Sequence, residues 1–170
     1  MVILDRDGTL IEECHYLNRP EQVVLIPGLV DALKAMAQLG LKLVVITNQA
    51  GVARSYLDLQ KLGQIHARFE QLLAAEGIAL DGIYFCPHHP DDGCACRKPQ
   101  TGLVEQAIDD LGGDAGKIWV VGDRESDIGF RRNLQITTFL VRTGYGEETE
   151  ARGRHCADYV VDGLPETADI

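Results

Sequence analysis

The chain carries pairs of acidic side chains at spacings that suit chemistry on a phosphate group. The first pair, Asp5 and Asp7, follows the apolar run Val2–Leu4 and precedes Gly8, where the chain can turn sharply. One carboxylate held there can attack phosphorus and form an aspartyl phosphate, which divides a difficult displacement into two steps. The other can protonate the leaving oxygen and then deprotonate water. The alternative is an ordinary Asp-Gly turn. A calcium loop of the D-x-D-x-D-G type is excluded, because the glycine comes two positions too early.

A second acidic pair lies in the sequence VGDRESD, residues 121–127. Asp123 ends a predicted strand and Asp127 lies four residues later, so both carboxylates can face one point at the start of a helix. Together with Asp5 they suit a hard cation with oxygen ligands, and Mg²⁺ is the usual partner of phosphate chemistry. Helix capping could explain one of these acids. It does not explain why acids recur at matching strand ends.

Hydrogen-bond donors and one cation complete this set. Thr47 and Asn48 end the second predicted strand and can donate to a phosphoryl oxygen. Lys98 supplies the positive charge that phosphoryl transfer needs near its nucleophile. The alternative for Lys98 is an ordinary solvated lysine.

The segment CPHHPDDGCACRKPQTG, residues 86–102, indicates a second, different metal site. Three cysteines and a histidine (Cys86, His88 or His89, Cys94 and Cys96) form a tetrahedral ligand set suited to structural Zn²⁺. A disulfide and a metal-free loop are the alternatives. Arg97 and Lys98 follow at once, so we interpret the loop 86–96 as a scaffold that fixes where these two cations point. The remaining thiols, Cys14 and Cys156, are expected to be inert.

Composition narrows the class of protein. The chain has 170 residues, 45% of them hydrophobic, and a formal net charge of −10. This length predicts one domain, residues 1–170, with a core that needs no disulfides. The negative charge argues against binding to nucleic acid. No secretory signal and no apolar run long enough to span a membrane is found, so we expect a cytoplasmic protein without a membrane partner.

Apolar runs alternate with segments of helical periodicity along the chain. We expect strands at Val2–Leu4, Leu41–Ile46, Ile83–Phe85, Ile118–Val121 and Ile136–Val141, and helices at Leu29–Leu39, Asp58–Ala75, Thr101–Leu111 and Asp127–Asn133. Near-continuous apolar strands separated by helices predict an α/β fold, a three-layer, doubly wound (Rossmann-like) parallel sheet. Ligands of such sheets bind beyond the carboxyl ends of the strands, at the switch point. Nearly all the unusual side chains of the chain follow predicted strands.

These residues resemble the four motifs of the haloacid dehalogenase (HAD) phosphatase superfamily, in order and in strand placement. The resemblance covers almost the whole chain. It implies that Asp5 is the nucleophile, that Asp7 is the general acid and base, and that Thr47 and Lys98 stabilise the phosphoryl group. It also implies Mg²⁺ held by Asp5, Asp123 and the backbone carbonyl of Asp7, with Asp127 supporting the metal or the lysine. For zinc, the family pattern places the imidazole ligand at His88.

Within the superfamily, the zinc loop is similar to that of the D-glycero-D-manno-heptose 1,7-bisphosphate 7-phosphatases and their histidinol-phosphate phosphatase relatives, which are capless. The segments Thr47–Arg54 and Leu140–Gly144 favour the heptose enzymes. This resemblance implies removal of the 7-phosphate of a small phosphorylated sugar, giving heptose 1-phosphate for nucleotide-activated heptose synthesis. A histidinol-phosphate phosphatase, another small HAD phosphatase and a non-catalytic zinc-dependent binding domain are the alternatives. An open, capless site does not require a second subunit, so we expect a monomer.

The same resemblance implies a set of substrate contacts around the pocket. They are Asp5, Arg6, Asp7, Glu13, His15, Tyr16, Thr47, Asn48, Gln49, Ala50, Arg97, Lys98 and Arg124, and the chemistry of a sugar bisphosphate adds Arg54. Arg97, with Arg54 or Arg124, is expected to hold a distal phosphate, because an arginine fork suits a remote phosphate better than a lysine does. For Arg54 the alternative is an exposed residue of a surface turn.

Overall fold

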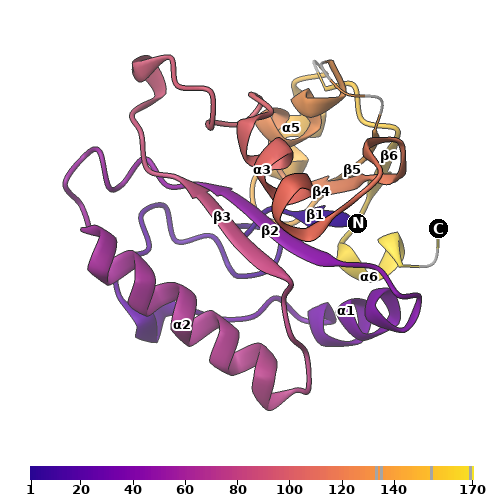
Figure 1. The fold of residues 1–170 in the computed structure, drawn as a ribbon, viewed down its shortest axis with the longest axis horizontal. Coiled ribbons are helices and arrows are strands. Elements are labelled where there is room, and N and C mark those ends of the chain that lie inside the picture. The colour runs from indigo at the N-terminus through magenta and orange to yellow at the C-terminus, as the bar shows by residue number, and fades with distance from the viewer. Residues whose placement is uncertain (133, 135, 154, 169) are drawn as a thin grey trace.

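The structure is a computed structural model, and it describes residues 1–132, 134, 136–153, 155–168 and 170. Its strands form one parallel sheet in the order β3-β2-β1-β4-β5-β6 (Figure 1). The strands are β1 (Val2–Leu4), β2 (Leu43–Asn48), β3 (Gly82–Cys86), β4 (Trp119–Gly122), β5 (Thr137–Val141) and β6 (Tyr159–Val161). The helices are α1 (Leu29–Gln38), α2 (Leu59–Ala75), α3 (Gly102–Leu111), α4 (Glu125–Ile128), α5 (Gly146–Ala151) and α6 (Leu164–Thr167).

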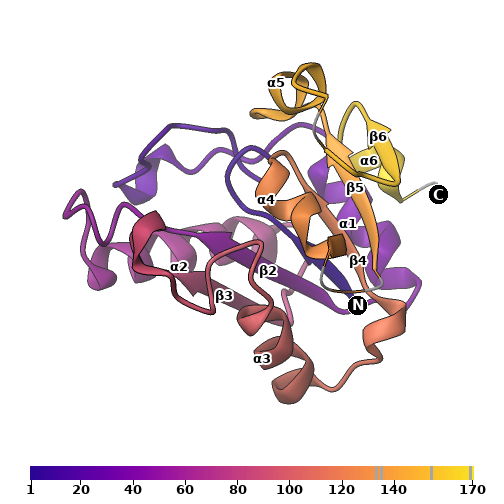
Figure 2. The same ribbon diagram turned by 90° about the horizontal axis from the view of Figure 1, so that it is seen from above.

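Helices cover both faces of the sheet, which explains why its strands are apolar throughout. Along β1, Val2 and Leu4 pack against α1, α2 and α6, whereas Ile3 between them packs against α3 and the segment after α4. Figure 1 shows α1, α2 and α6 below the strands. Figure 2 views the molecule from above, from the side of the sheet that α3 and α4 cover. The predicted three-layer parallel α/β fold is confirmed. The segments after β1 and β2 carry no inserted domain in the described part of the chain, as a capless fold requires.

Most predicted elements are present, with shifted boundaries. The second strand is Leu43–Asn48 rather than Leu41–Ile46, so the motif residues Thr47 and Asn48 are its last two residues. The helix predicted at 127–133 begins earlier, at Glu125, and continues as a 3₁₀ turn, Gly129–Arg132. Asn133, its predicted last residue, lies outside the described residues.

Three elements after Val141 were not predicted: α5, β6 and α6. They have six, three and four residues, and the two helices are too short for a helical period to be recognised. β6 pairs with β5 at the edge of the sheet, where Tyr159 remains exposed. Short edge elements depend on the finished sheet rather than on their own propensity.

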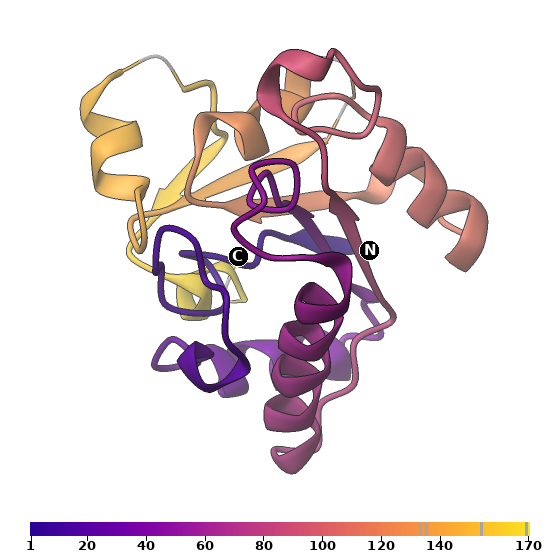
Figure 3. The same cartoon turned by 90° about the vertical axis from the view of Figure 1, so that its left-hand side faces the viewer.

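The strand order places a switch point between β1 and β4. The chain winds outward from β1 through β2 and β3, then returns to pair β4 with the other side of β1. The loops after these strands meet at one edge of the sheet, which faces the viewer in Figure 3. No helix within the described residues has the length and apolar character needed to cross a membrane.

The close approach of α4 to β4 leads to a test of the fold. A Cβ added to Gly122 would lie 2.4 Å from the Cβ of Asp127, so alanine there forces the backbone of α4 away from the strand. We expect Gly122→Ala to lower the free energy of unfolding by about 1–3 kcal/mol. Urea unfolding followed by circular dichroism measures this change.

Gly63 provides the matched control. It lies exposed within α2, and an added Cβ there meets nothing within 4 Å. Gly63→Ala should therefore stabilise the protein, by roughly 0.5–1 kcal/mol, because alanine has the higher helix propensity. If both variants unfold at the same urea concentration as the unmodified chain, the tight contact between β4 and α4 is wrong.

Candidate active site

A cavity of about 630 Å³ opens at the edge of the sheet where β1, β2, β3 and β4 end. Its lining includes every predicted substrate contact except one. Arg54 is exposed in the turn after β2 and does not line the cavity. The lining residues that had been predicted are Asp5, Arg6, Asp7, Glu13, His15, Tyr16, Thr47, Asn48, Gln49, Ala50, Arg97, Lys98 and Arg124.

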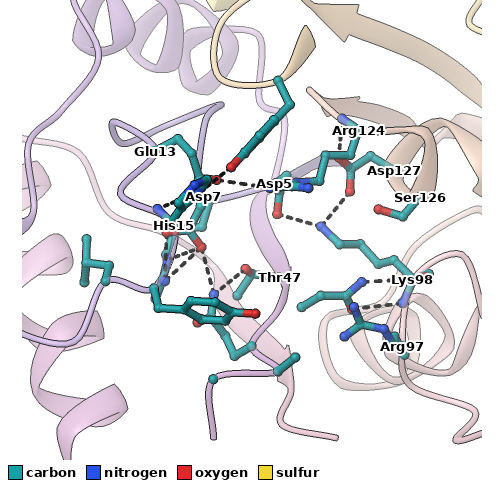
Figure 4. Close-up of a pocket in the computed structure, with 18 of the residues that line it drawn as sticks. Asp5, Asp7, Glu13, His15, Thr47, Arg97, Lys98, Arg124, Ser126 and Asp127 are labelled. Atoms are coloured by element: carbon teal, nitrogen blue, oxygen red, sulfur yellow. Dashed lines mark hydrogen bonds and ion pairs between the residues drawn. The ribbon is translucent and has the colours of Figure 1, made fainter. Parts of the chain in front are cut away.

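A buried ammonium group lies at the centre of the site. The Nζ of Lys98 is 2.6 Å from Oδ1 of Asp5 and 2.7 Å from Oδ1 of Asp127, and it donates to the carbonyl of Ile46 at 2.7 Å. Figure 4 shows Lys98 reaching between these two carboxylates. Burial alone would lower the pKa of Lys98, but the two carboxylates outweigh it and raise the pKa, so the lysine stays charged.

The backbone of Lys98 is held by Asn48, the last residue of β2. The side-chain amide of Asn48 accepts from the Lys98 N–H at 3.0 Å and donates to the Lys98 carbonyl at 3.3 Å. Both ends of this amide are therefore engaged by the protein. In this arrangement Asn48 positions the lysine loop, and the second N–H of its amide remains available to a ligand in the cavity that it lines.

Three carboxylates converge beside the lysine. Asp5, Asp123 and Asp127 each offer an oxygen within 4.8 Å of the others. Burial raises the pKa of Asp5 to about 7, and the neighbouring acids Asp127 and Asp7 add to it against the opposing charge of Lys98. Burial, then Asp5 and Asp127, raise the pKa of Asp123 to about 8. One ammonium group cannot neutralise three carboxylates, so their full ionisation leaves two negative charges uncompensated.

The donor set fits a divalent, oxygen-binding cation. Oδ2 of Asp123 accepts from the Tyr145 N–H at 2.8 Å, but its Oδ1 is buried with no hydrogen-bond partner among the described residues. A buried carboxylate oxygen without a partner is costly unless a cation meets it. Hard carboxylate oxygens are the ligands that Mg²⁺ prefers.

Asp7 is oriented by two neighbours. Arg6 is buried, and its Nε and Nη2 donate to the Asp7 carboxylate at 3.1 and 2.8 Å. Nε2 of Gln49 donates to Oδ2 of Asp7 at 2.8 Å and to the Thr47 hydroxyl at 2.9 Å. Burial acts to raise the pKa of Asp7, but the charge and hydrogen bonds of Arg6 outweigh it and lower the pKa.

The four predicted zinc ligands lie together at the start of the loop that carries Lys98. Cys86, Cys94 and Cys96 have Sγ atoms 3.2–3.6 Å apart, and Nδ1 of His88 is 3.1 Å from Sγ of Cys96. Zn–S bonds of about 2.3 Å at tetrahedral angles put sulfur atoms about 3.8 Å apart, so the cluster is near zinc geometry. All three cysteines are free, and the ring of His89 lies elsewhere, where it accepts from the Asp91 N–H.

Some lining residues were not predicted, and Tyr145 is the most prominent. It comes directly after the segment Leu140–Gly144, which includes the end of the predicted fifth strand. The available signal was its position, one residue beyond that segment and between two glycines. Ser126 and Leu57 also line the cavity and gave no such signal.

Comparison with known proteins gives consistent matches over most of the chain. Residues 95–167 match a family model described as HAD-hydrolase-like. A protein from Pseudomonas aeruginosa named D-glycero-beta-D-manno-heptose-1,7-bisphosphate 7-phosphatase is 39% identical over 150 residues, 88% of this chain and 84% of that protein. A Thermoplasma volcanium protein named as a probable D-glycero-D-manno-heptose-1,7-bisphosphate 7-phosphatase is 35% identical, over 83% of this chain and 97% of its own length.

Solved structures agree with these relatives. The D,D-heptose 1,7-bisphosphate phosphatase from B. bronchiseptica, crystallised with magnesium and phosphate, superposes with a TM-score of 0.92 at 34% identity, over 99% of this chain and 95% of that one. The corresponding enzyme from Burkholderia thailandensis gives a TM-score of 0.75 at 28% identity, over 98% of this chain and 94% of that one.

The raised pKa values of Asp5 and Asp123 predict that Mg²⁺ binding releases protons. Both carboxyls must ionise to act as ligands, so affinity should rise with pH through the pKa of Asp5, about 7, and that of Asp123, about 8, and level off about one pH unit above the higher value. Near pH 7 we expect roughly one to two protons per Mg²⁺ bound, because Asp5 is about half protonated and Asp123 mostly protonated there. Calorimetry in two buffers of different ionisation enthalpy counts these protons. Equal affinity at pH 6 and pH 8, with no proton release, would contradict the arrangement.

The cysteine cluster predicts that zinc stabilises the fold. Free Zn²⁺ at about a hundred times its dissociation constant should raise the free energy of unfolding by about 2.7 kcal/mol. Cys94→Ser should abolish this gain and also lower activity, because Arg97 and Lys98 follow the cluster directly. Thermal unfolding with and without a chelator measures the effect. Cys156→Ser, outside the cluster, is the control, and an equal loss in both variants would refute the scaffold role.

Proposed function

The chain belongs to the HAD-like hydrolases and, within them, to the family of heptose-1,7-bisphosphate 7-phosphatases, and we propose that it removes the 7-phosphate of D-glycero-D-manno-heptose 1,7-bisphosphate. The product would be heptose 1-phosphate and inorganic phosphate. The Pseudomonas and Haemophilus relatives are named for the beta anomer, which is therefore the first substrate to test. The observation that carries the proposal is the convergence of Asp5, Asp7, Lys98 and Asp123 on one site at the switch point.

Asp5 is the proposed nucleophile. It follows β1 directly, and Lys98 holds its Oδ1 at 2.6 Å, which limits the directions its carboxylate can take. Attack of an Asp5 oxygen on phosphorus expels the sugar oxygen and leaves an aspartyl phosphate. Water then attacks that phosphorus, which releases phosphate and restores the Asp5 carboxylate. The ammonium group of Lys98 lies close enough to stabilise charge on the transferred group.

Asp7 is the proposed proton carrier. It lies two residues after the nucleophile, and Arg6 and Gln49 fix its carboxylate. As the acid it would give a proton to the leaving sugar oxygen, and as the base it would take one from the attacking water. The lowered pKa of Asp7 suits the second role in the free protein. An anionic phosphate bound beside it would raise that pKa toward the first role.

A Mg²⁺ ion is the proposed cofactor of this site. Asp5 and Asp123 would hold it with the backbone carbonyl of Asp7, and Asp127 would keep Lys98 in place. When bound, the ion neutralises charge on the phosphoryl group and on the surrounding carboxylates. Zinc, held by Cys86, His88, Cys94 and Cys96, would be structural and take no part in the reaction.

Two arginines are proposed to bind the phosphate that is not removed. Arg97 and Arg124 both line the cavity, and Nη1 of Arg97 is buried without a hydrogen-bond partner among the described residues. A guanidinium fork can hold a phosphate through two parallel hydrogen bonds. Tyr16, exposed at the rim, packs edge-on against Tyr56 and would contact the sugar between the two phosphates.

The proposal predicts a preference that kinetics can measure. With Mg²⁺ present, kcat/KM for the beta anomer of heptose 1,7-bisphosphate should exceed that for histidinol phosphate by about a hundredfold or more, near 2.7 kcal/mol in the transition state. The alpha anomer, tested alongside, shows whether the pocket distinguishes the two positions of the distal phosphate. Faster turnover of histidinol phosphate would refute the proposed substrate.

Asp5→Asn tests the nucleophile with little change in shape. We expect kcat to fall by roughly a thousandfold or more, because an amide cannot form the aspartyl phosphate. Asp109→Asn, an exposed acid on α3, is the matched control and should keep the full rate. An Asp5→Asn enzyme with an unchanged rate would exclude Asp5 as the nucleophile.

A further inference from the structure

Tyr145 contacts three separate parts of the site. Its backbone N–H donates to Oδ2 of Asp123 at 2.8 Å, and the guanidinium carbon of Arg124 lies 3.8 Å from the centroid of its ring. Its hydroxyl is 2.5 Å from Nδ1 of His15. Nothing in the proposed chemistry uses this side chain. Its contacts nevertheless join the cation site to the cavity wall that carries Arg124.

The neighbours of Tyr145 leave its backbone little freedom. Gly144 has a φ of 57°, and a Cβ there would lie 2.3 Å from Oδ2 of Asp123. A Cβ at Gly146 would lie 1.7 Å from the carbonyl oxygen of Val141. Only glycine fits at both positions, so the chain passes tightly between β5 and the loop after β1. This constrained backbone places Tyr145 in the wall of the cavity.

The side-chain partners of Tyr145, Arg124 and His15, are themselves held by Glu13. Oε2 of Glu13 is 3.4 Å from Nη2 of Arg124, and Oε1 of Glu13 accepts from the His15 N–H at 2.6 Å. His15 has a φ of 60°, a left-handed conformation that persists in a non-glycine residue only when surrounding contacts hold it. Glu13, His15, Tyr145 and Arg124 thus form a closed ring of contacts.

Arg124 would have other partners without this ring. Together with Tyr145 it also lines a smaller cavity of about 360 Å³, which Glu125 and Glu148 line as well. The Arg124 side chain is 47% exposed, so packing alone does not fix its direction. A free guanidinium could turn toward those carboxylates and away from the substrate. The face of an aromatic ring attracts a guanidinium and limits its rotation.

We propose that Tyr145 is a specificity-determining residue that positions Arg124 to bind the distal phosphate of the substrate. This inference rests on the proposed function, since it assumes a substrate with two phosphates. Tyr145 acts through Arg124 and touches neither the nucleophile nor the transferred phosphate. Its removal therefore weakens the discrimination between a bisphosphate and the corresponding monophosphate more than it weakens hydrolysis itself.

The experiment compares two replacements of similar bulk. Tyr145→Phe keeps the aromatic face and loses the hydroxyl, whereas Tyr145→Leu fills much of the space without an aromatic face. For each variant, kcat/KM is measured with heptose 1,7-bisphosphate and with heptose 7-phosphate, which lacks the distal phosphate. We expect Tyr145→Leu to reduce the ratio of the two values by about tenfold, and Tyr145→Phe by about twofold or less. Equal losses of kcat/KM on both substrates would mean that Tyr145 has only a structural role, which would overturn the inference.

A double-mutant cycle shows whether the effect passes through Arg124. With Arg124→Ala already present, adding Tyr145→Leu should change the ratio by less than about twofold, because the residue that it positions is gone. Independent, additive losses would overturn the inference. Tyr159→Ala, an exposed tyrosine on β6 stacked against Phe139, is the matched control and should leave both values unchanged.

The two proposals fail in different ways. An unmodified enzyme that does not prefer the bisphosphate to the monophosphate contradicts the proposed function. If the unmodified enzyme has that preference and Tyr145→Leu leaves the ratio of the two kcat/KM values unchanged, only the inference is contradicted. Thermal unfolding of each variant identifies any loss that comes from misfolding.

Discussion

The buried ammonium group of Lys98 imposes the constraint on which the rest of the site depends. A charge out of contact with water is tolerated only when opposite charges and hydrogen bonds surround it. Asp5 after β1, Asp127 on α4 and the carbonyl of Ile46 within β2 supply these partners. Two further features bring the lysine to this point. The cysteine cluster lies in the loop before it, and the Asn48 amide hydrogen-bonds to its backbone from β2.

Those features of the fold and site that depend on strand order could be predicted from the sequence. Apolar runs buried on both faces of a parallel sheet mark the strands, and residues after such strands meet at one edge. Asp5, Thr47 and Asp123 could therefore be brought together in advance, and the resemblance to the family's motifs added Lys98. The cluster of Cys86, His88, Cys94 and Cys96 could also be predicted, because three thiols and an imidazole in a short loop suit a metal and the family pattern favours His88 over His89.

Features that depend on tertiary contacts could not be predicted. β6, α5 and α6 are too short for a periodic pattern and form against a sheet that already exists. The hydrogen bonds of the Asn48 amide to the backbone of Lys98, fifty residues away in sequence, gave no signal in the sequence. Arg54 was expected at the pocket and lies outside it, because the turn after β2 directs it to solvent. Tyr145 is held by glycines that the sequence displays but whose close contacts only the folded chain reveals.

The pairing of β1 with β4 also affects how the chain folds. Val2 pairs with Leu43 on one side and with Trp119 on the other, so the central strand is complete only after a long loop has closed. Non-local parallel pairing of this kind slows folding. The same pairing places Asp5 beside Asp123, so a partly folded chain lacks the cation site. A cation or phosphate that binds there contacts residues from both halves of the sheet and binds only when β1 and β4 are paired. It would therefore favour the folded state by mass action.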